Sequence, residues 1–141
     1  MTEYIIRGIA QALAVFGYKV YEDTVEQDLE IPCFVIDEVA AIRLKRLNKR
    51  YKLTISISIS FLSDTAENAR FMAERLPWAI EDISCKAPDG KLWKFHSKSP
   101  ECNIDDQHTM HCLVDYTTEV AFEVAKQLMT KINLTTEVTN G

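Results

Sequence analysis

Residues 51–61 read Tyr-Lys-Leu-Thr-Ile-Ser-Ile-Ser-Ile-Ser-Phe, and this stretch decides the fold. Its odd positions carry apolar or aromatic side chains, whereas its even positions carry a lysine or a hydroxyl group. Successive side chains of a strand point to opposite faces of its sheet, so this alternation predicts a strand with one dry face and one wet face.

A second extended stretch, residues 33–44, precedes this strand, and Leu47-Asn48-Lys49 lies between the two as a turn. The apolar residues of 33–44 occupy both parities. This fits either a strand covered on both faces or a strand with a bulge near Asp37. We therefore predict a long antiparallel β-hairpin at the centre of the sheet.

Two segments further out show helical periodicity, residues 2–17 and residues 64–84. Pro77 lies inside the second, where it predicts a kink or an early end because proline lacks an amide proton. The remaining extended runs are residues 18–21, 91–97 and 111–122. We expect the last two runs to form another hairpin, joined by a polar loop at 98–107.

This order of elements predicts an α+β fold, with two helices packed on one mostly antiparallel sheet of about four to five strands. We place a single domain at residues 1–124. Residues 125–141 are mostly polar and form a predicted C-terminal arm that is either flexible or docked on a neighbour.

The composition excludes several classes of protein. The chain has 141 residues, 47% of them hydrophobic and 26% charged, which is typical of one globular domain with a true core. Its net charge of −5 disfavours nucleic acid as the main ligand. No uncharged apolar run approaches the about 18 residues that cross a bilayer, so we predict no membrane partner. The start of the chain lacks the pattern of a secretion signal, and we expect synthesis in the cytoplasm.

The residues that could carry chemistry do not form a convincing site. The four glycines are isolated, which excludes a glycine-rich phosphate loop. The best metal candidate is a group of thiols and imidazoles with two nearby carboxylates: Cys102, His108, His111 and Cys112, with Asp105 and Asp106. Neighbouring strand residues such as His111 and Cys112 point to opposite faces, however, and metal ligands must converge.

A nucleophilic pair of Cys33 or Cys112 with one of the histidines His96, His108 and His111 is also conceivable, but no spacing supports it. We therefore predict no enzymatic activity, no metal and no cofactor. The four cysteines are expected to be reduced thiols.

Charge segregation is the most informative feature of the surface. Six cations lie within ten residues at the tip of the predicted central hairpin: Arg43, Lys45, Arg46, Lys49, Arg50 and Lys52. Five anions lie between residues 22 and 30: Glu22, Asp23, Glu26, Asp28 and Glu30. The hairpin tip is either simply solvated, or it meets a different, acidic patch on the next copy in a closed ring.

The sequence resembles the tail terminator proteins of long-tailed bacteriophages and of prophages of Gram-positive bacteria. The resemblance covers about residues 3–122. It rests on Gln27–Ile36 (QDLEIPCFVI), on Asn48–Tyr51 (NKRY) in the basic hairpin and on Leu113–Tyr116 (LVDY). It implies a structural virion protein of the phage tail, made in the bacterial cytoplasm, with no catalytic residues.

The resemblance further implies a hexameric ring that caps the completed tail tube and ends its polymerisation. The implied partners are other copies of the chain, the tail tube protein and a neck or head-completion protein, with DNA only passing through the channel. On this view the interface residues are Arg43, Lys45, Arg46, Lys49, Arg50, Glu22, Asp23, Glu26 and Asp28. The alternatives are a small-molecule or metal-binding α+β module and, third, a thiol-dependent enzyme.

Overall fold

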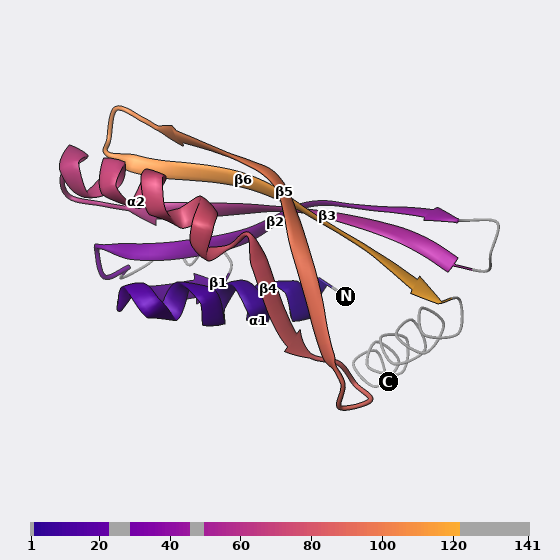
Figure 1. The fold of residues 1–141 in the computed structure, drawn as a ribbon. Helices are drawn as coiled ribbons and strands as arrows, with labels where there is room; N and C mark the ends of the chain where they lie inside the picture. Colours follow the sequence, from indigo (N-terminus) through magenta and orange to yellow (C-terminus); the bar gives the residue numbers. More distant parts are fainter. Residues whose placement is uncertain (1, 23–28, 46–49, 122–141) are drawn as a thin grey trace, which may run out of the picture.

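The computed structural model describes residues 2–22, 29–45 and 50–121. The elements are α1 (Thr2–Leu13), a 3-10 turn η1 (Ala14–Phe16), β1 (Lys19–Glu22), β2 (Cys33–Lys45), β3 (Arg50–Leu62), α2 (Ala66–Ala79), β4 (Asp82–Lys86), β5 (Leu92–Ile104) and β6 (Thr109–Ala121). Figure 1 shows the six strands, which form one sheet in the order β1-β2-β3-β6-β5-β4. The predicted C-terminal arm at 125–141 lies outside the described residues.

β3 is the centre of the sheet, with β2 on one side and β6 on the other. Its odd-numbered residues from Ile55 to Phe61 are buried, whereas the even-numbered residues between them are only half-buried. Val114 and Tyr116 of β6 lie beside Ile57 and Ile55 on the same buried face. The predicted strand with one dry face and one wet face is therefore confirmed.

β2 combines both of the arrangements that its sequence left open. Its first four residues, Cys33–Ile36, are all buried, so this part is covered on both faces. The register with β3 then shifts between Glu38 and Ala40, which is a bulge. Beyond the bulge the pairing continues to Lys45 opposite Tyr51, and the long antiparallel hairpin is confirmed.

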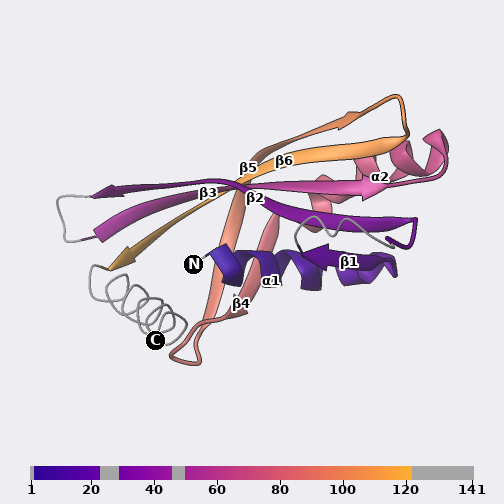
Figure 2. The same ribbon diagram turned by 180° about the vertical axis from the view of Figure 1, so that it is seen from behind.

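The two helices cover the dry face of the sheet from different ends. α1 packs mainly against β4, whereas α2 packs against β5 and β6 (Figures 1 and 2). The helical residues in the core are Tyr4, Ile5, Ile9 and Leu13 of α1 and Ala69, Met72 and Leu76 of α2. The hydroxyl group of Tyr116 donates a hydrogen bond of 2.7 Å to the carbonyl oxygen of Ile80, which ties β6 to the end of α2.

A glycine allows α1 to approach β4 closely. A Cβ atom placed on Gly8 would lie 3.1 Å from the carbonyl oxygen of Ser84 and 3.3 Å from Cδ1 of Ile83. Larger side chains would push the helix away from the strand. At the end of the helical segment, Gly17 has a φ of 80°, and its amide donates to the Ala14 carbonyl, which is the left-handed ending that glycine favours.

The predicted fold class, an α+β domain with four to five mostly antiparallel strands, is wrong. The domain is mostly β: its curled sheet has six described strands, and four of these have 13 residues each. The sheet is also mixed, because β1 runs parallel to β2. Residues 82–86 belong to β4 rather than to the second helix. Ile83 and Cys85 alternate there with exposed Asp82 and Lys86, a period-two pattern too short to override the preceding helical one.

The expected loop at 98–107 is also wrong. β5 continues to Ile104, and the turn to β6 occupies only residues 105–108. The pairing of β5 with β6 shifts register between Lys98 and Glu101. This irregularity interrupts the alternation of side chains, which explains why the segment reads as a polar loop in sequence.

Candidate assembly surface

The outer half of the central hairpin extends beyond the core. We call residues 39–45 of β2 and 50–54 of β3 the arm. Figure 1 shows the arm reaching past the start of α1, on the side away from α2. Every residue of β2 from Glu38 to Lys45 is exposed, in contrast to the buried block at the start of the strand. The arm therefore presents side chains that the core does not use.

The two faces of the arm differ in chemistry. Arg43 and Lys45 pair with Leu53 and Tyr51 and share their face, which continues the dry face of the sheet. The Arg43 guanidinium lies over the Tyr51 ring at 5.0 Å from its centroid. One face is consequently basic and aromatic.

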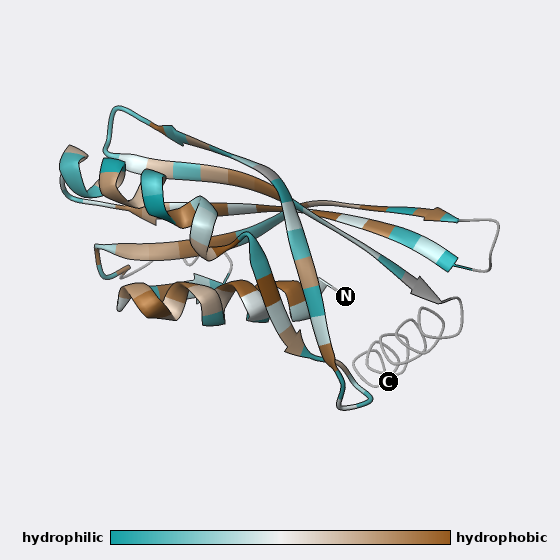
Figure 3. Ribbon diagram, in the orientation of Figure 1, coloured by the Kyte–Doolittle hydropathy of each residue, from teal (hydrophilic) through white to brown (hydrophobic). Residues whose placement is uncertain are grey.

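Ile42 and Leu44 lie on the opposite face of the arm, beside Thr54 and Lys52. Together with Val39 at the bulge, they are 55%, 56% and 57% exposed, respectively. Figure 3 shows this alternation of hydrophobic and hydrophilic residues along the arm. Large aliphatic side chains gathered on one exposed segment are typical of a surface that another chain covers.

The arm also presents a strand edge. β1 pairs only with Cys33–Ile36 of β2. In the described part of the chain no strand lies beside residues 39–45 on the side away from β3. A strand edge of this length can pair with a strand of another chain, although the bulge and the cations restrict which strands fit.

The structure separates the described members of the predicted acidic and basic groups. Glu22 ends β1 beside Ile36, and Ile36 precedes Lys45 by nine residues along β2. At the rise of an extended strand this corresponds to about 30 Å, so Glu22 does not meet Lys45 within one chain. Glu22, Arg43, Lys45 and Arg50 are all exposed. The other predicted interface residues, Asp23, Glu26, Asp28, Arg46 and Lys49, lie outside the described residues.

Sequence reasoning missed the apolar face of the arm and its edge. The signal was present as Ile42-Arg43-Leu44-Lys45, in which aliphatic residues alternate with cations. The sequence alone leaves open whether these aliphatic residues are buried, because nothing in it shows where β1 stops pairing with β2.

The candidate metal ligands do not converge. Cys102 and Cys112 are directly opposite each other on β5 and β6, and Cys112 is buried. His111 lies on the other face, as the alternation of strand side chains predicts. Within the described ranges, no group of three or more histidines, cysteines and acidic residues is arranged to hold a metal ion.

The rings of His96 and His111 instead bond to carboxylates. Nδ1 of His96 lies 2.7 Å from Oδ1 of Asp82, and Nε2 of His111 lies 2.8 Å from Oδ2 of Asp105. A shallow pocket between α1 and β4 includes Gln11 and Asp82 in its lining. Asp82 is the partner of His96, so the carboxylate of this pocket already has a hydrogen-bond partner.

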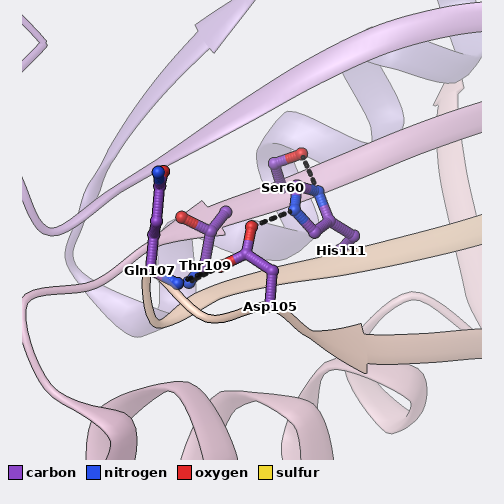
Figure 4. Close-up of polar contacts among 5 residues, drawn as sticks. All are labelled: Ser60, Asp105, Gln107, Thr109 and His111. Atoms are coloured by element: carbon purple, nitrogen blue, oxygen red, sulfur yellow. Dashed lines mark hydrogen bonds and ion pairs between the residues drawn. The ribbon is translucent and has the colours of Figure 1, made fainter.

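Asp105 organises the turn between β5 and β6 (Figure 4). Its Oδ1 atom accepts hydrogen bonds from the backbone amides of Gln107 at 2.8 Å and Thr109 at 3.0 Å. Its Oδ2 atom contacts His111, whose other ring nitrogen lies 3.3 Å from the hydroxyl of Ser60. These contacts are internal to the turn and its neighbouring strand, which indicates a structural role.

The contribution of the Asp105 carboxylate to stability should depend on pH. The hydrogen bond from His111, followed by that from the Thr109 amide, holds the pKa of Asp105 below its usual value of 3.8. Its contribution is therefore complete above pH 3.8 and is lost as the pH falls through the lowered pKa. We expect the stability difference between wild type and Asp105→Asn to be constant above pH 3.8 and to shrink as the pH falls below it. Thermal melts of the two proteins over a series of acidic pH values measure it, and a difference that does not change with pH would contradict the prediction.

The same turn forces His108 into a left-handed conformation, with a φ of 64°. Glycine adopts this conformation without the steric cost that a Cβ atom imposes. We expect His108→Gly to raise the free energy of unfolding by up to about 1 kcal/mol and His108→Val to lower it. Urea unfolding of the three proteins tests this order, and a destabilised glycine variant would contradict it.

Comparison with known proteins identifies the family. A search of curated proteins finds no match. In the structure, none of the described helices is both long and apolar enough to cross a membrane. The family model described as phage tail terminator protein matches residues 4–127, which is most of the chain, and confirms the resemblance in the sequence. The chain therefore belongs to the phage tail terminator protein family, a family of structural proteins of the phage tail.

Proposed function

We propose that this protein assembles as a hexameric ring on the end of the phage tail tube, where it ends tube polymerisation and offers a surface to neck or head-completion proteins. Membership in the tail terminator family supports this proposal. The observation that carries it is the arm, which exposes the aliphatic side chains of Val39, Ile42 and Leu44 beside a basic face. Such a surface suits a subunit that becomes complete only in an assembly.

The contact between neighbouring subunits is head-to-tail in this proposal. The arm of one subunit meets the acidic segment of the next, which begins at Glu22. Glu22 and Lys45 are too far apart to meet within one chain, and this suits a ring in which each subunit offers a different patch to each neighbour. The residues assigned to this contact are Arg43, Lys45, Arg46, Lys49 and Arg50 on one side, and Glu22, Asp23, Glu26 and Asp28 on the other.

In this proposal, DNA passes through the channel of the ring. The net charge of −5 favours passage, because a strongly basic lumen would retain phosphate groups. In this proposal the protein has no catalytic activity and needs no cofactor. Its function depends on shape and on contacts with copies of itself, the tail tube protein and the neck.

Two measurements test the proposal. Native mass spectrometry and negative-stain micrographs of the purified protein, alone and with tail tubes, should show six-fold rings, either free or at tube ends. Removing the protein from the phage that encodes it should give tails of irregular, excessive length, and resupplying it should restore normal tails. Normal tails in its absence would refute the capping function.

A further inference from the structure

Two cysteines on adjacent strands occupy positions that a disulfide can join. Cys102 of β5 is paired in register with Cys112 of β6. Three residues further toward the turn, the backbone amide of Asp105 donates a hydrogen bond of 3.0 Å to the carbonyl oxygen of Thr109. Asp105 and Thr109 are therefore a hydrogen-bonded pair. Because hydrogen-bonded and non-hydrogen-bonded pairs alternate, Cys102 and Cys112 form a non-hydrogen-bonded pair.

This kind of pair brings two cysteines close together. The Cα atoms of a non-hydrogen-bonded pair lie about 4.5 Å apart, within the range of about 4.4–6.8 Å that disulfides span. Both side chains project from the same face of the sheet, because residues directly opposite each other on paired strands share a face. Both residues are free thiols in the structure.

The two thiols differ in access and acidity. Cys112 is buried in the core, whereas Cys102 at the edge of the core is partly exposed. Their mutual hydrogen bond lowers the pKa of Cys102 and raises the pKa of Cys112. Since the thiolate is the reactive species, Cys102 is the thiol that meets an oxidant first. Burial raises the pKa of Cys33 and Cys85, which makes them less reactive.

We propose that Cys102 and Cys112 form an oxidation site. A small-molecule disulfide oxidises the two thiols, and the resulting Cys102–Cys112 disulfide bond links β5 to β6. The Cys102 thiolate attacks one sulfur of oxidised glutathione, forming a mixed disulfide and releasing one glutathione thiolate, which takes up a proton. Cys112 then gives up its proton and attacks Cys102 Sγ, which displaces the second glutathione. Two protein thiols are thereby oxidised, and one oxidised glutathione is reduced to two molecules of glutathione. A tail protein leaves the reducing cytoplasm when the phage is released from the cell, so the Cys102–Cys112 disulfide bond would form after assembly.

The test treats the purified, folded chain with oxidised glutathione, then alkylates the remaining thiols under denaturing conditions. We expect the number of alkylated thiols per chain to fall from four to two. Peptide mapping should find Cys102 joined to Cys112, with the mass lowered by two hydrogen atoms. Four alkylated thiols after treatment, a bond that involves Cys33 or Cys85, or a bond between two chains would overturn the proposal.

Single substitutions separate the two steps. Cys112→Ala should stop at the mixed disulfide, with glutathione attached to Cys102. Cys102→Ser, at a partly exposed position that tolerates the change, should keep all three remaining thiols. Cys85→Ala is the matched control, because it removes a buried cysteine outside the pair and should still lose two thiols. If Cys112→Ala fails to fold, Cys102→Ser still tests the proposal, because the Cys102–Cys112 disulfide cannot form in this variant. A loss of two thiols from Cys102→Ser, as in the wild type, would refute the site.

Discussion

Replacing Ile57 with alanine should lower the free energy of unfolding by about 3 kcal/mol. Ile57 lies near the middle of β3, has no exposed surface, and is paired with Val114 on the dry face. The substitution removes three carbon atoms from a fully buried position in the hydrophobic core. The long paired strands around it restrict collapse into the space, so the loss combines transfer and cavity costs.

The neighbouring residue provides the matched control. Ser58 lies on the same strand but on the wet face, opposite Asp37 and Leu113. Ser58→Ala should change the stability by less than about 0.5 kcal/mol. Urea unfolding of both variants gives the comparison, with equal m-values as evidence that each unfolds from the same compact state. Similar losses at both positions would contradict the assignment of one dry and one wet face to β3.

The sequence predicts β3 well because its alternation is uninterrupted from residue 51 to residue 61. The hairpin with β2 is predicted for the same reason, although the aliphatic residues of β2 occupy both parities. The structure shows why: Cys33–Ile36 is buried on both faces, and the bulge before Ala40 then shifts the parity. A bulge is a property of strand pairing, so a single strand's sequence indicates it only weakly.

The missed strands have a related cause. β4 has five residues, too few for its alternation to compete with the helical pattern that precedes it. The outer part of β5 is polar and is paired through the register shift between Lys98 and Glu101. β1 itself agrees with the extended run predicted at residues 18–21, but its parallel pairing with β2 was not predicted, because a parallel neighbour is not joined by a short turn that the sequence would show. The mostly β character of the fold therefore depends on long-range pairing.

The candidate surface was predicted in part. The clustering of cations at the hairpin tip is visible in the sequence, and Arg43, Lys45 and Arg50 are exposed in the structure. Their role in assembly remains a proposal. The aliphatic face and the strand edge of the arm depend on where the neighbouring strand ends, which required the structure. In the proposed ring, these two features would give a contact that begins with charge attraction an apolar area to bury.

Reversing two charges of the arm, Lys45→Glu with Arg50→Glu, should abolish ring formation and leave the fold intact. Both side chains are exposed, and neither belongs to the core, so the free energy of unfolding should change by less than about 0.5 kcal/mol. In the proposed ring, each reversed arm would face the acidic segment of the next subunit. Like charges placed opposite each other cost enough at every contact to prevent closure. Native mass spectrometry and micrographs of tube ends measure the loss.

The controls separate charge complementarity from a general effect of negative charge. Lys91→Glu, in the exposed turn before β5, changes the net charge without touching the arm and should leave rings intact. Adding Glu22→Lys and Glu26→Lys to the arm variant restores opposite signs across the proposed contact and should restore rings. Wild-type rings should also weaken as salt rises, because the screening length falls from about 8 Å at physiological ionic strength to about 3 Å at 1 M. If the double reversal still forms rings, the arm is not the contact between subunits. If the charge swap fails to rescue them, the arm meets a surface other than the acidic segment, and the tail tube becomes the next surface to test.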